Sequence, residues 1–197
     1  MKKALAIAGT LALTTTPTVS FADHLEPKES EIRPFGNLAH TNLSGRDLSG
    51  ANLSFASLRD ANLSDTNLSG ASLWYANLRN ANLSGANLSG ASLIFASLNG
   101  ANLSGADIRD ANLRDTKLSF ANLNSANLSR TDLSFANSID TNLSGANLTS
   151  ADLSRANLKN ADMTGAKLSG ITANNLINCP RFLTVGWVCE NNSIKRH

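Results

Sequence analysis

Few side chains of this protein could take part in chemistry, and the sequence keeps them apart. The three histidines are widely separated: His24 and His40 lie sixteen residues apart in the first part of the chain, and His197 is the last residue. No two are close enough in sequence to hold a metal or to relay a proton. The chain also lacks a nucleophile–base motif, a glycine-rich phosphate loop and the spacing of a zinc site. We therefore expect no enzyme activity, no catalytic or metal-binding residues and no cofactor.

Carboxylates are the remaining candidates. Residues 36–170 contain ten Asp and no Glu, against ten Lys plus Arg. These carboxylates could bind a cation weakly or act as acid and base. Because arginines lie nearby in the sequence, solvated surface charges are the favoured interpretation. The aspartates concerned are Asp107, Asp110, Asp115, Asp132 and Asp152, and the arginines are Arg109, Arg114 and Arg130.

The N-terminus has the order of a secretory signal peptide. Lys2 and Lys3 precede an apolar run from Ala4 to Leu13, and Ser20-Phe21-Ala22 offers small residues for cleavage. The run is too short to cross a bilayer, which takes about 20 residues. We expect residues 1–22 to be removed and the protein to be exported, with a buried N-terminal helix as the alternative. The expected compartment is the bacterial periplasm, and a thylakoid lumen or secretion would also fit.

Loss of residues 1–22 changes the charge. The formal net charge of +2 falls to zero, because the segment holds two lysines and no acidic residue. A neutral protein has no field to attract nucleic acid or an anionic membrane. We therefore expect neither as a partner, and no membrane span.

Cys179 and Cys189 are the only cysteines. An even count in an exported chain predicts a disulfide between them, with two separate buried thiols as the alternative. A lone pair with no histidine nearby is a poor zinc site, since zinc takes four ligands or three and a water.

Most of the chain is a five-residue repeat. Residues 36–170 form twenty-seven pentads without an insertion, of which Ala81-Asn82-Leu83-Ser84-Gly85 is typical. A period of five fits neither a helix nor a flat strand, because leucines five apart would change face in both. It fits a chain that bends once per pentad. The first and third residues then point inward, and Ser, Gly, Asn and Asp form turns.

This pattern of Ala-(Asn/Asp)-Leu followed by two variable residues resembles the pentapeptide-repeat family. The resemblance covers residues 36–170. It implies an all-β fold, a right-handed quadrilateral β-helix with four pentads per coil, and binding through the faces of the solenoid.

A coil of four pentads places residues twenty apart above one another, and two columns support it. Asparagines share one column, at Asn42, Asn62, Asn82, Asn102, Asn122 and Asn142. Aromatic residues share another, interrupted by Asp115: Phe35, Phe55, Tyr75, Phe95 and Phe135. Such ladders are expected where equal positions lie one strand spacing apart.

The chain outside the repeat differs in composition. Residues 23–35 are polar and contain two prolines, so they are expected to form a tail and a short lead-in. Residues 171–197 become apolar and contain both cysteines. We expect them to form a C-terminal cap, because an open solenoid end exposes its core.

Ser138 takes a place that is leucine in most pentads. A tolerated defect with a bound water is favoured over a local distortion that turns Ile139 inward.

Outward apolar residues are the best candidate for a functional site. Trp74 and Ile94 occupy the fourth place of pentads one coil apart, next to the aromatic column. Such a patch often marks an interaction surface, although the rings could serve only to stack adjacent coils. The residues of this predicted interaction patch are Phe55, Trp74, Tyr75, Ile94, Phe95 and Phe135.

The sequence thus favours a non-enzymatic exported scaffold that binds another protein or a second copy of itself. Some members of the pentapeptide-repeat family, which this repeat resembles, mimic DNA and protect DNA gyrase. That role is disfavoured here by the export signal and the balanced charge. A weak metal binder or a surface binder, such as an ice-binding solenoid, is a further alternative.

Overall fold

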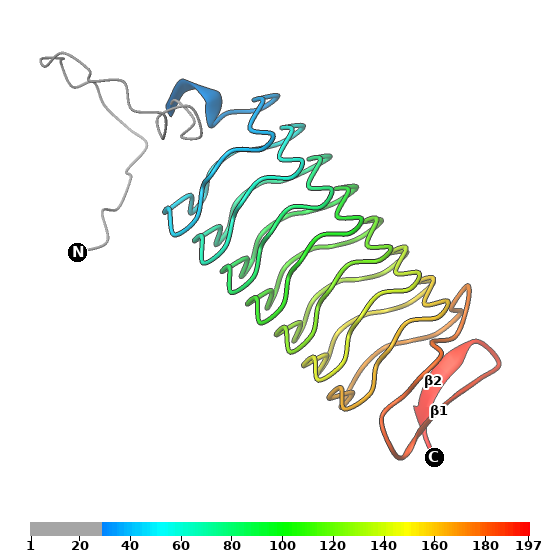
Figure 1. Cartoon of the computed structure of the whole chain (residues 1–197). Coiled ribbons are helices and arrows are strands. Elements are labelled where there is room, and N and C mark those ends of the chain that lie inside the picture. The colour runs from blue at the N-terminus through cyan, green and yellow to red at the C-terminus, as the bar shows by residue number, and fades with distance from the viewer. Residues whose placement is uncertain (1–28) are drawn as a thin grey trace, which may run out of the picture.

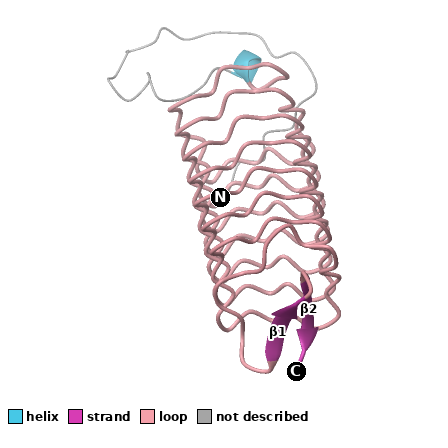
Figure 2. Cartoon of the chain, turned by 90° about the vertical axis from the view of Figure 1, so that its right-hand side faces the viewer, coloured by secondary structure: helices cyan, strands magenta, loops and turns pink. Residues whose placement is uncertain are grey.

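The computed structural model describes residues 29–197, and the predicted signal peptide lies outside them. The described chain winds into a rod of stacked coils (Figure 1). A 3-10 helix, η2 (Glu29–Glu31), lies at one end of the rod. A hairpin of β1 (Trp187–Glu190) and β2 (Ser193–Arg196) lies at the other end (Figure 2). None of the helices among the described residues is long or apolar enough to cross a membrane.

Adjacent coils are joined by parallel bridges between residues twenty apart. The second place of each pentad pairs with the second place one coil on, as in Asn52↔Ser72 and Ser72↔Ser92. Backbone hydrogen bonds follow the same offset. The N–H of Leu53 donates to the carbonyl of Ser72, and the N–H of Ser72 donates to that of Ala51. The predicted all-β quadrilateral β-helix with four pentads per coil is confirmed.

The interior is filled by the first and third places of the pentads. Ala81 and Leu83, for example, are fully buried. Burial of this apolar surface in every coil is the main favourable term for folding. All first-place threonines except the half-buried Thr41 are also buried, and the threonine hydroxyls donate to backbone carbonyls. Thr66 Oγ1 donates to the carbonyl of Leu43 at 2.9 Å, so no unpaired polar group results.

Each corner is a β-turn that ends a pentad. The N–H of Ala56 donates to the carbonyl of Leu53 at 3.1 Å, and Phe55 between them has φ of 60°. A positive φ at the third position is what a type II turn requires. Glycine, as at Gly85 with φ of 66°, meets this need without strain. The fifth place is therefore the residue that the backbone constrains most.

Ser138 keeps the inward place without a change of register. Its N–H donates to the carbonyl of Asn157 at 2.8 Å, and its side chain is buried. Ile139 stays half-buried at its outward place, so the distortion that would turn it inward does not occur. Within the described residues, the buried Oδ1 of neighbouring Asn137 has no hydrogen-bond partner. The defect is thus local.

The winding continues past Gly170 before the hairpin closes the end. Asp152 still bridges Thr172, but Asn157 bridges Asn178, which is twenty-one residues on. β1 and β2 then pair antiparallel, with Cys189 opposite Ile194. Ile194 packs into the core cluster, where it is 7% exposed. A disulfide of S–S length 1.98 Å joins Cys179 to Cys189 and ties the hairpin to the last coil.

Candidate functional site

Four rings of the aromatic column stack along one corner of the rod. The ring centroids of Phe35 and Phe55 are 4.8 Å apart, those of Phe55 and Tyr75 are 5.1 Å apart, and those of Tyr75 and Phe95 are 4.8 Å apart. The planes of each pair lie within 20° of parallel. This spacing matches the distance between neighbouring strands of a sheet, so the coil repeat itself sets the stack.

The turn conformation points these rings outward. Phe35, Phe55, Tyr75 and Phe95 all occupy the fifth place and have φ between 57° and 61°. A bulky residue at positive φ is strained. Contact between rings offsets part of that strain, because each aromatic pair contributes about 0.5–1.5 kcal/mol beyond area burial.

Trp74 extends the column sideways onto the neighbouring place. Its ring meets Phe55 edge-on, at 5.9 Å between centroids and 62° between planes, and it lies 5.1 Å from Tyr75. Ile94 is half-buried one coil further on, and its carbonyl accepts the N–H of Tyr75. We call this surface the aromatic patch; it consists of Phe35, Phe55, Trp74, Tyr75, Ile94 and Phe95.

Solvent reaches the patch. Trp74 is 43% exposed and Tyr75 is 44% exposed, although each has aromatic neighbours on two sides. Among the described residues, no other segment covers these rings. Contiguous exposed apolar patches are common at interaction surfaces, so this surface is the candidate functional site.

Phe135 lies apart from the aromatic patch, although the sequence predicted it as a member. Asp115 takes its place in the column between Phe95 and Phe135. Two guanidinium groups cover the ring instead: Arg114 lies 4.8 Å and Arg155 5.3 Å from the centroid. Such cation–π contacts stabilise an exposed ring by about 0.5–1 kcal/mol each. The structure therefore brings together five of the six predicted patch residues.

The aspartates that could have done chemistry are occupied by local partners. The side chain of Arg109 donates three hydrogen bonds to Asp107 at 2.7–3.1 Å, and that of Arg130 donates to both carboxylate oxygens of Asp110 at 2.6 and 2.7 Å. These hydrogen bonds hold the pKa of Asp107 and of Asp110 below the ordinary value. Arg114 reaches Asp115 at 3.4 Å.

Asp132 and Asp152 act as turn residues. Each accepts the backbone N–H two residues on, from Ser134 at 2.9 Å and from Ser154 at 2.8 Å. No group of three or more potential metal ligands occurs among residues 29–197.

The asparagine column performs a structural task that the sequence only partly revealed. From Asn62 onward, the Nδ2 of each asparagine in the column donates to the Oδ1 one coil before, as Asn82 does to Asn62 at 3.3 Å. The same Oδ1 accepts a backbone N–H two residues on, as Asn62 does from Ser64. Asparagine thus forms its turn and joins two coils, which explains its frequency at the second place.

A groove at the C-terminal end was not predicted. Its volume is about 610 Å³, and it lies between the pentad 166–170 and the segment that enters β1. Repeat spacing gives no signal for it, because it exists only where the chain leaves the repeat. The lining residues are Thr149, Ala166, Lys167, Leu168, Ser169, Gly170, Thr184, Val185, Gly186, Trp187 and Arg196.

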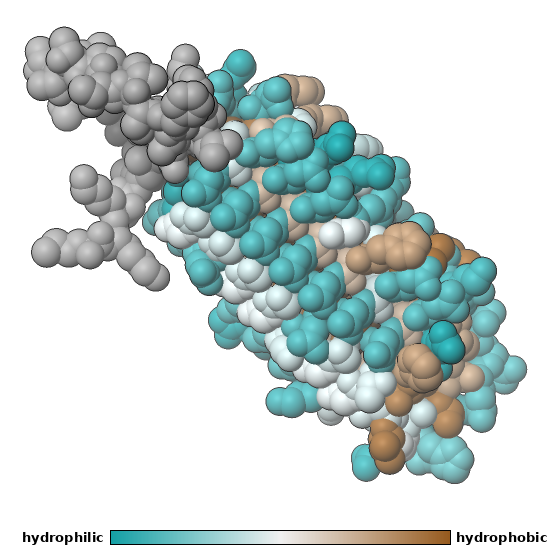
Figure 3. All heavy atoms as spheres, viewed as in Figure 1, coloured by the Kyte–Doolittle hydropathy of each residue, from teal (hydrophilic) through white to brown (hydrophobic). Residues whose placement is uncertain are grey.

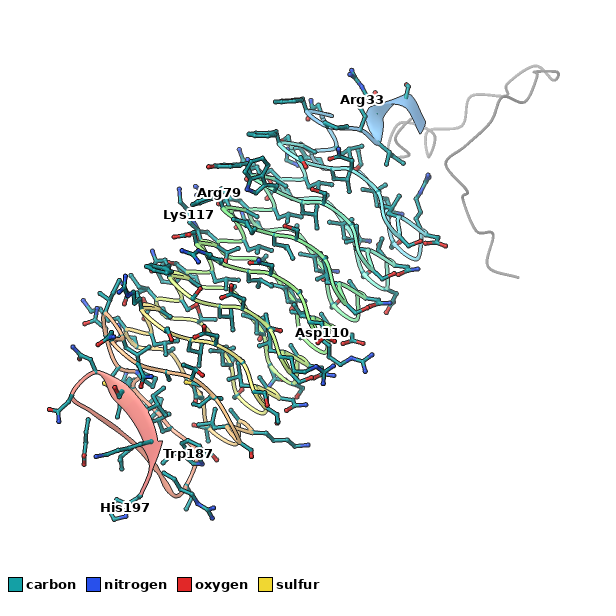
Figure 4. All side chains as sticks on the ribbon, turned by 180° about the vertical axis from the view of Figure 1, so that it is seen from behind. Arg33, Arg79, Asp110, Lys117, Trp187 and His197 are labelled. Atoms are coloured by element: carbon teal, nitrogen blue, oxygen red, sulfur yellow. A yellow bond between two sulfur atoms is a disulfide. The ribbon has the colours of Figure 1, made fainter. Side chains whose placement is uncertain are left out.

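Side chains differ in kind between the faces and ends of the rod. Figure 3 shows hydrophilic and small residues over most of one face, with apolar residues collected toward the C-terminal end. Exposed Phe182 and Val185 belong to that end. Figure 4 places Arg79 and Lys117 along one edge of the rod and Asp110 on the opposite edge.

The model of a family described as pentapeptide repeats matches with eight copies, over residues 37–74, 75–110, 106–137 and 139–172. No curated protein matches significantly.

The solved structures that resemble this chain include pentapeptide repeat proteins of cyanobacteria and of a plant. HetL from Nostoc sp. strain PCC 7120, a pentapeptide repeat protein involved in heterocyst differentiation regulation, is 28% identical; the match covers 83% of this chain and 86% of HetL, with a TM-score of 0.37. Another pentapeptide repeat protein of Nostoc is 42% identical over 44% of this chain and 69% of its own, with a TM-score of 0.41. A pentapeptide repeat protein from the thylakoid lumen of Arabidopsis thaliana is 33% identical; the match covers 56% of this chain and 70% of that protein, with a TM-score of 0.38.

Proposed function

The chain belongs to the pentapeptide repeat family, and from this premise we propose that it is an exported, non-enzymatic scaffold that binds a partner protein through the aromatic patch. The proposal rests mainly on the exposed stack of Phe55, Tyr75 and Phe95, against which Trp74 packs. Aromatic residues that are held rigidly dominate the binding energy of many protein interfaces. A rod of stacked coils fixes these rings before binding, so little conformational entropy is lost when a partner docks.

Charges near the patch favour a partner with acidic groups at the rim of its contact. Arg59 and Arg79 are exposed and occupy the face that follows the aromatic corner, each four residues beyond a ring of the stack. Arg59 has a carboxylate partner in Asp60 at 2.9 Å. We expect carboxylates of the partner to approach Arg79 while its apolar side chains cover the rings.

Export is part of the proposal. The Cys179–Cys189 disulfide supports an oxidising compartment, because such bonds are rare in the cytosol. The bacterial periplasm is the proposed location, and a thylakoid lumen would satisfy the same chemistry. Sequencing of the mature protein should find Asp23 as the first residue, whereas Met1 would contradict export by cleavage.

A role in mimicking DNA receives no support from the charges. A DNA mimic needs an acidic face, and here arginines neutralise Asp107 and Asp110. The repeat also holds as many basic as acidic residues.

Two matched variants test the patch. Trp74→Ser with Phe95→Gly uses residues that the chain itself places at the fourth and fifth places, so the coils should still fold. Phe120→Gly is the control, because Phe120 is an exposed fifth-place ring with φ of 63° that lies outside the patch. Proteins captured from a periplasmic extract after crosslinking should include one that the double variant loses and the control retains. Equal recovery with all three proteins would contradict the proposed site.

A further inference from the structure

The groove beside the C-terminal hairpin contains an unpaired edge of the solenoid, in which Lys167, Ser169 and Gly170 are exposed and Ala166 and Leu168 are buried. It lies between Ala166–Gly170, the last pentad of one face, and Thr184–Trp187, which leads into β1. Its volume of about 610 Å³ is within the usual range of ligand sites. Figure 4 shows Trp187 and His197 at this end of the rod.

Backbone groups at this edge have lost the partners that every earlier coil provides. One coil before, the N–H of Leu148 donates to the carbonyl of Lys167 at 2.9 Å, and that of Ser150 donates to Ser169 at 2.8 Å. The equivalent donors of the last pentad are Leu168 and Gly170. Because the chain turns away into the cap, neither N–H has an acceptor within residues 29–197.

The acceptor of the same edge is also unpaired. The carbonyl of Ala146 accepts the N–H of Lys167 at 2.9 Å, but the carbonyl of Ala166 receives no donor within the described chain. Two donors and one acceptor at alternate residues are the pattern that an added strand would satisfy. A buried backbone group without a partner is unfavourable, so the edge gains by pairing.

The charged side chains that line the groove are all positive. Lys167 lies on the edge and Arg196 on β2, and no carboxylate lines the groove. Neither cation takes part in an ion pair within the described residues. Thr149, Ser169 and Thr184 are the other polar side chains among the lining residues.

We propose that this groove binds a short extended peptide with an acidic side chain, which adds to the last coil as a further strand. Its carbonyls accept the N–H groups of Leu168 and Gly170, and one of its N–H groups donates to the carbonyl of Ala166. Main-chain pairing of this kind gives affinity, while side-chain contacts give specificity.

The register within the solenoid indicates which peptide side chain should be acidic. Second-place side chains touch across one coil, as Asn67 Nδ2 does with Asp47 Oδ1 at 3.0 Å. A peptide residue bonded at the same register lies over Lys167, the second place of its pentad. A carboxylate there meets Lys167 and lies in the groove that Arg196 lines. An Ala-Asp-Leu-Ser-Gly peptide, capped at both ends, reproduces this register.

Calorimetric titration tests the proposal on the full mature protein with this peptide and with its Ala-Asn-Leu-Ser-Gly counterpart. The acidic peptide should bind about tenfold more tightly, because its carboxylate forms a charged hydrogen bond with Lys167 and the amide of its counterpart does not. Lys167→Gln and Arg196→Gln should each remove this preference. Lys159→Gln, an exposed lysine of the last coil outside the groove, should leave it unchanged.

Amide hydrogen exchange of Leu168 and Gly170 provides a readout of strand addition. The acidic peptide should slow exchange at both amides. Inorganic phosphate that binds equally well, with no protection of these amides, would show a site for free anions and overturn the peptide proposal. Self-association through this edge, detected by sedimentation and lost in Lys167→Gln, would also overturn it, as would absence of binding by either peptide.

Discussion

The rings of Phe55 and Tyr75 lie 5.1 Å apart with their planes 4° from parallel. Twenty residues separate them in the sequence, which is one turn of the solenoid. Each ring stands on a backbone with positive φ, a conformation that favours glycine. The stack is therefore a place where two effects oppose each other: backbone strain and contact between rings.

The first prediction separates these effects. Phe120→Gly removes strain from a ring that no aromatic contact joins, so it should leave stability unchanged or raise it. Tyr75→Gly removes the same strain but also two stacked contacts, so its free energy of unfolding should be lower than that of Phe120→Gly by about 1–2 kcal/mol. Chemical denaturation of the two variants measures this difference. Equal stabilities would mean that the stack contributes nothing and that its rings are kept for another reason.

The second prediction concerns the polar defect in the core. Leu118 and Leu158, at the same place one coil before and after Ser138, are buried. Ser138→Leu restores the repeat and should stabilise the protein by about 1–3 kcal/mol, the usual gain for burying a leucine side chain. A Leu83→Ala variant provides the opposite case and should lose about 3 kcal/mol. If Ser138→Leu lowers the melting temperature, the site has no room for the side chain.

A third prediction follows from the disulfide. The chain-entropy account gives the Cys179–Cys189 bond about 2–4 kcal/mol. In a solenoid each coil touches only its neighbours, so the loss should stay local. In the Cys179→Ser, Cys189→Ser double variant, amides of β1 and β2 should exchange faster while those near Leu83 keep their protection. Uniformly faster exchange along the rod would contradict a local role for the cap.

The fourth prediction uses the ion pair of Asp110 with Arg130. Its hydrogen bonds place the pKa of Asp110 below the ordinary value of 3.8. The stability that the pair contributes is thus present above pH 3.8 and is lost as the pH falls through the lower pKa of the folded state. In Arg130→Gln, carboxyl NMR should find the pKa of Asp110 moved up toward 3.8. An unchanged pKa would show that the pair is not maintained in solution.

The repeat made the fold predictable, because inward Leu and Ala at a fixed period leave the chain one way to bury them. The stacking of the rings from Phe55 to Phe95 was predictable too, because a coil of twenty residues places them above one another. The position of Phe135 outside the patch was not predicted, since it depends on Asp115 in the column and on the contacts of Arg114 and Arg155 with the ring. The groove beside Lys167 could not be foreseen, because its far wall is formed by a cap that obeys no repeat.

Site-specific photocrosslinking tests the aromatic patch most directly. A photoreactive phenylalanine placed at Tyr75 should crosslink in the native compartment to one defined protein. The same group at Phe120, which is equally outward, should not. A crosslinked species of identical mass from both positions, or none from Tyr75, would contradict the claim that the aromatic patch is the binding surface.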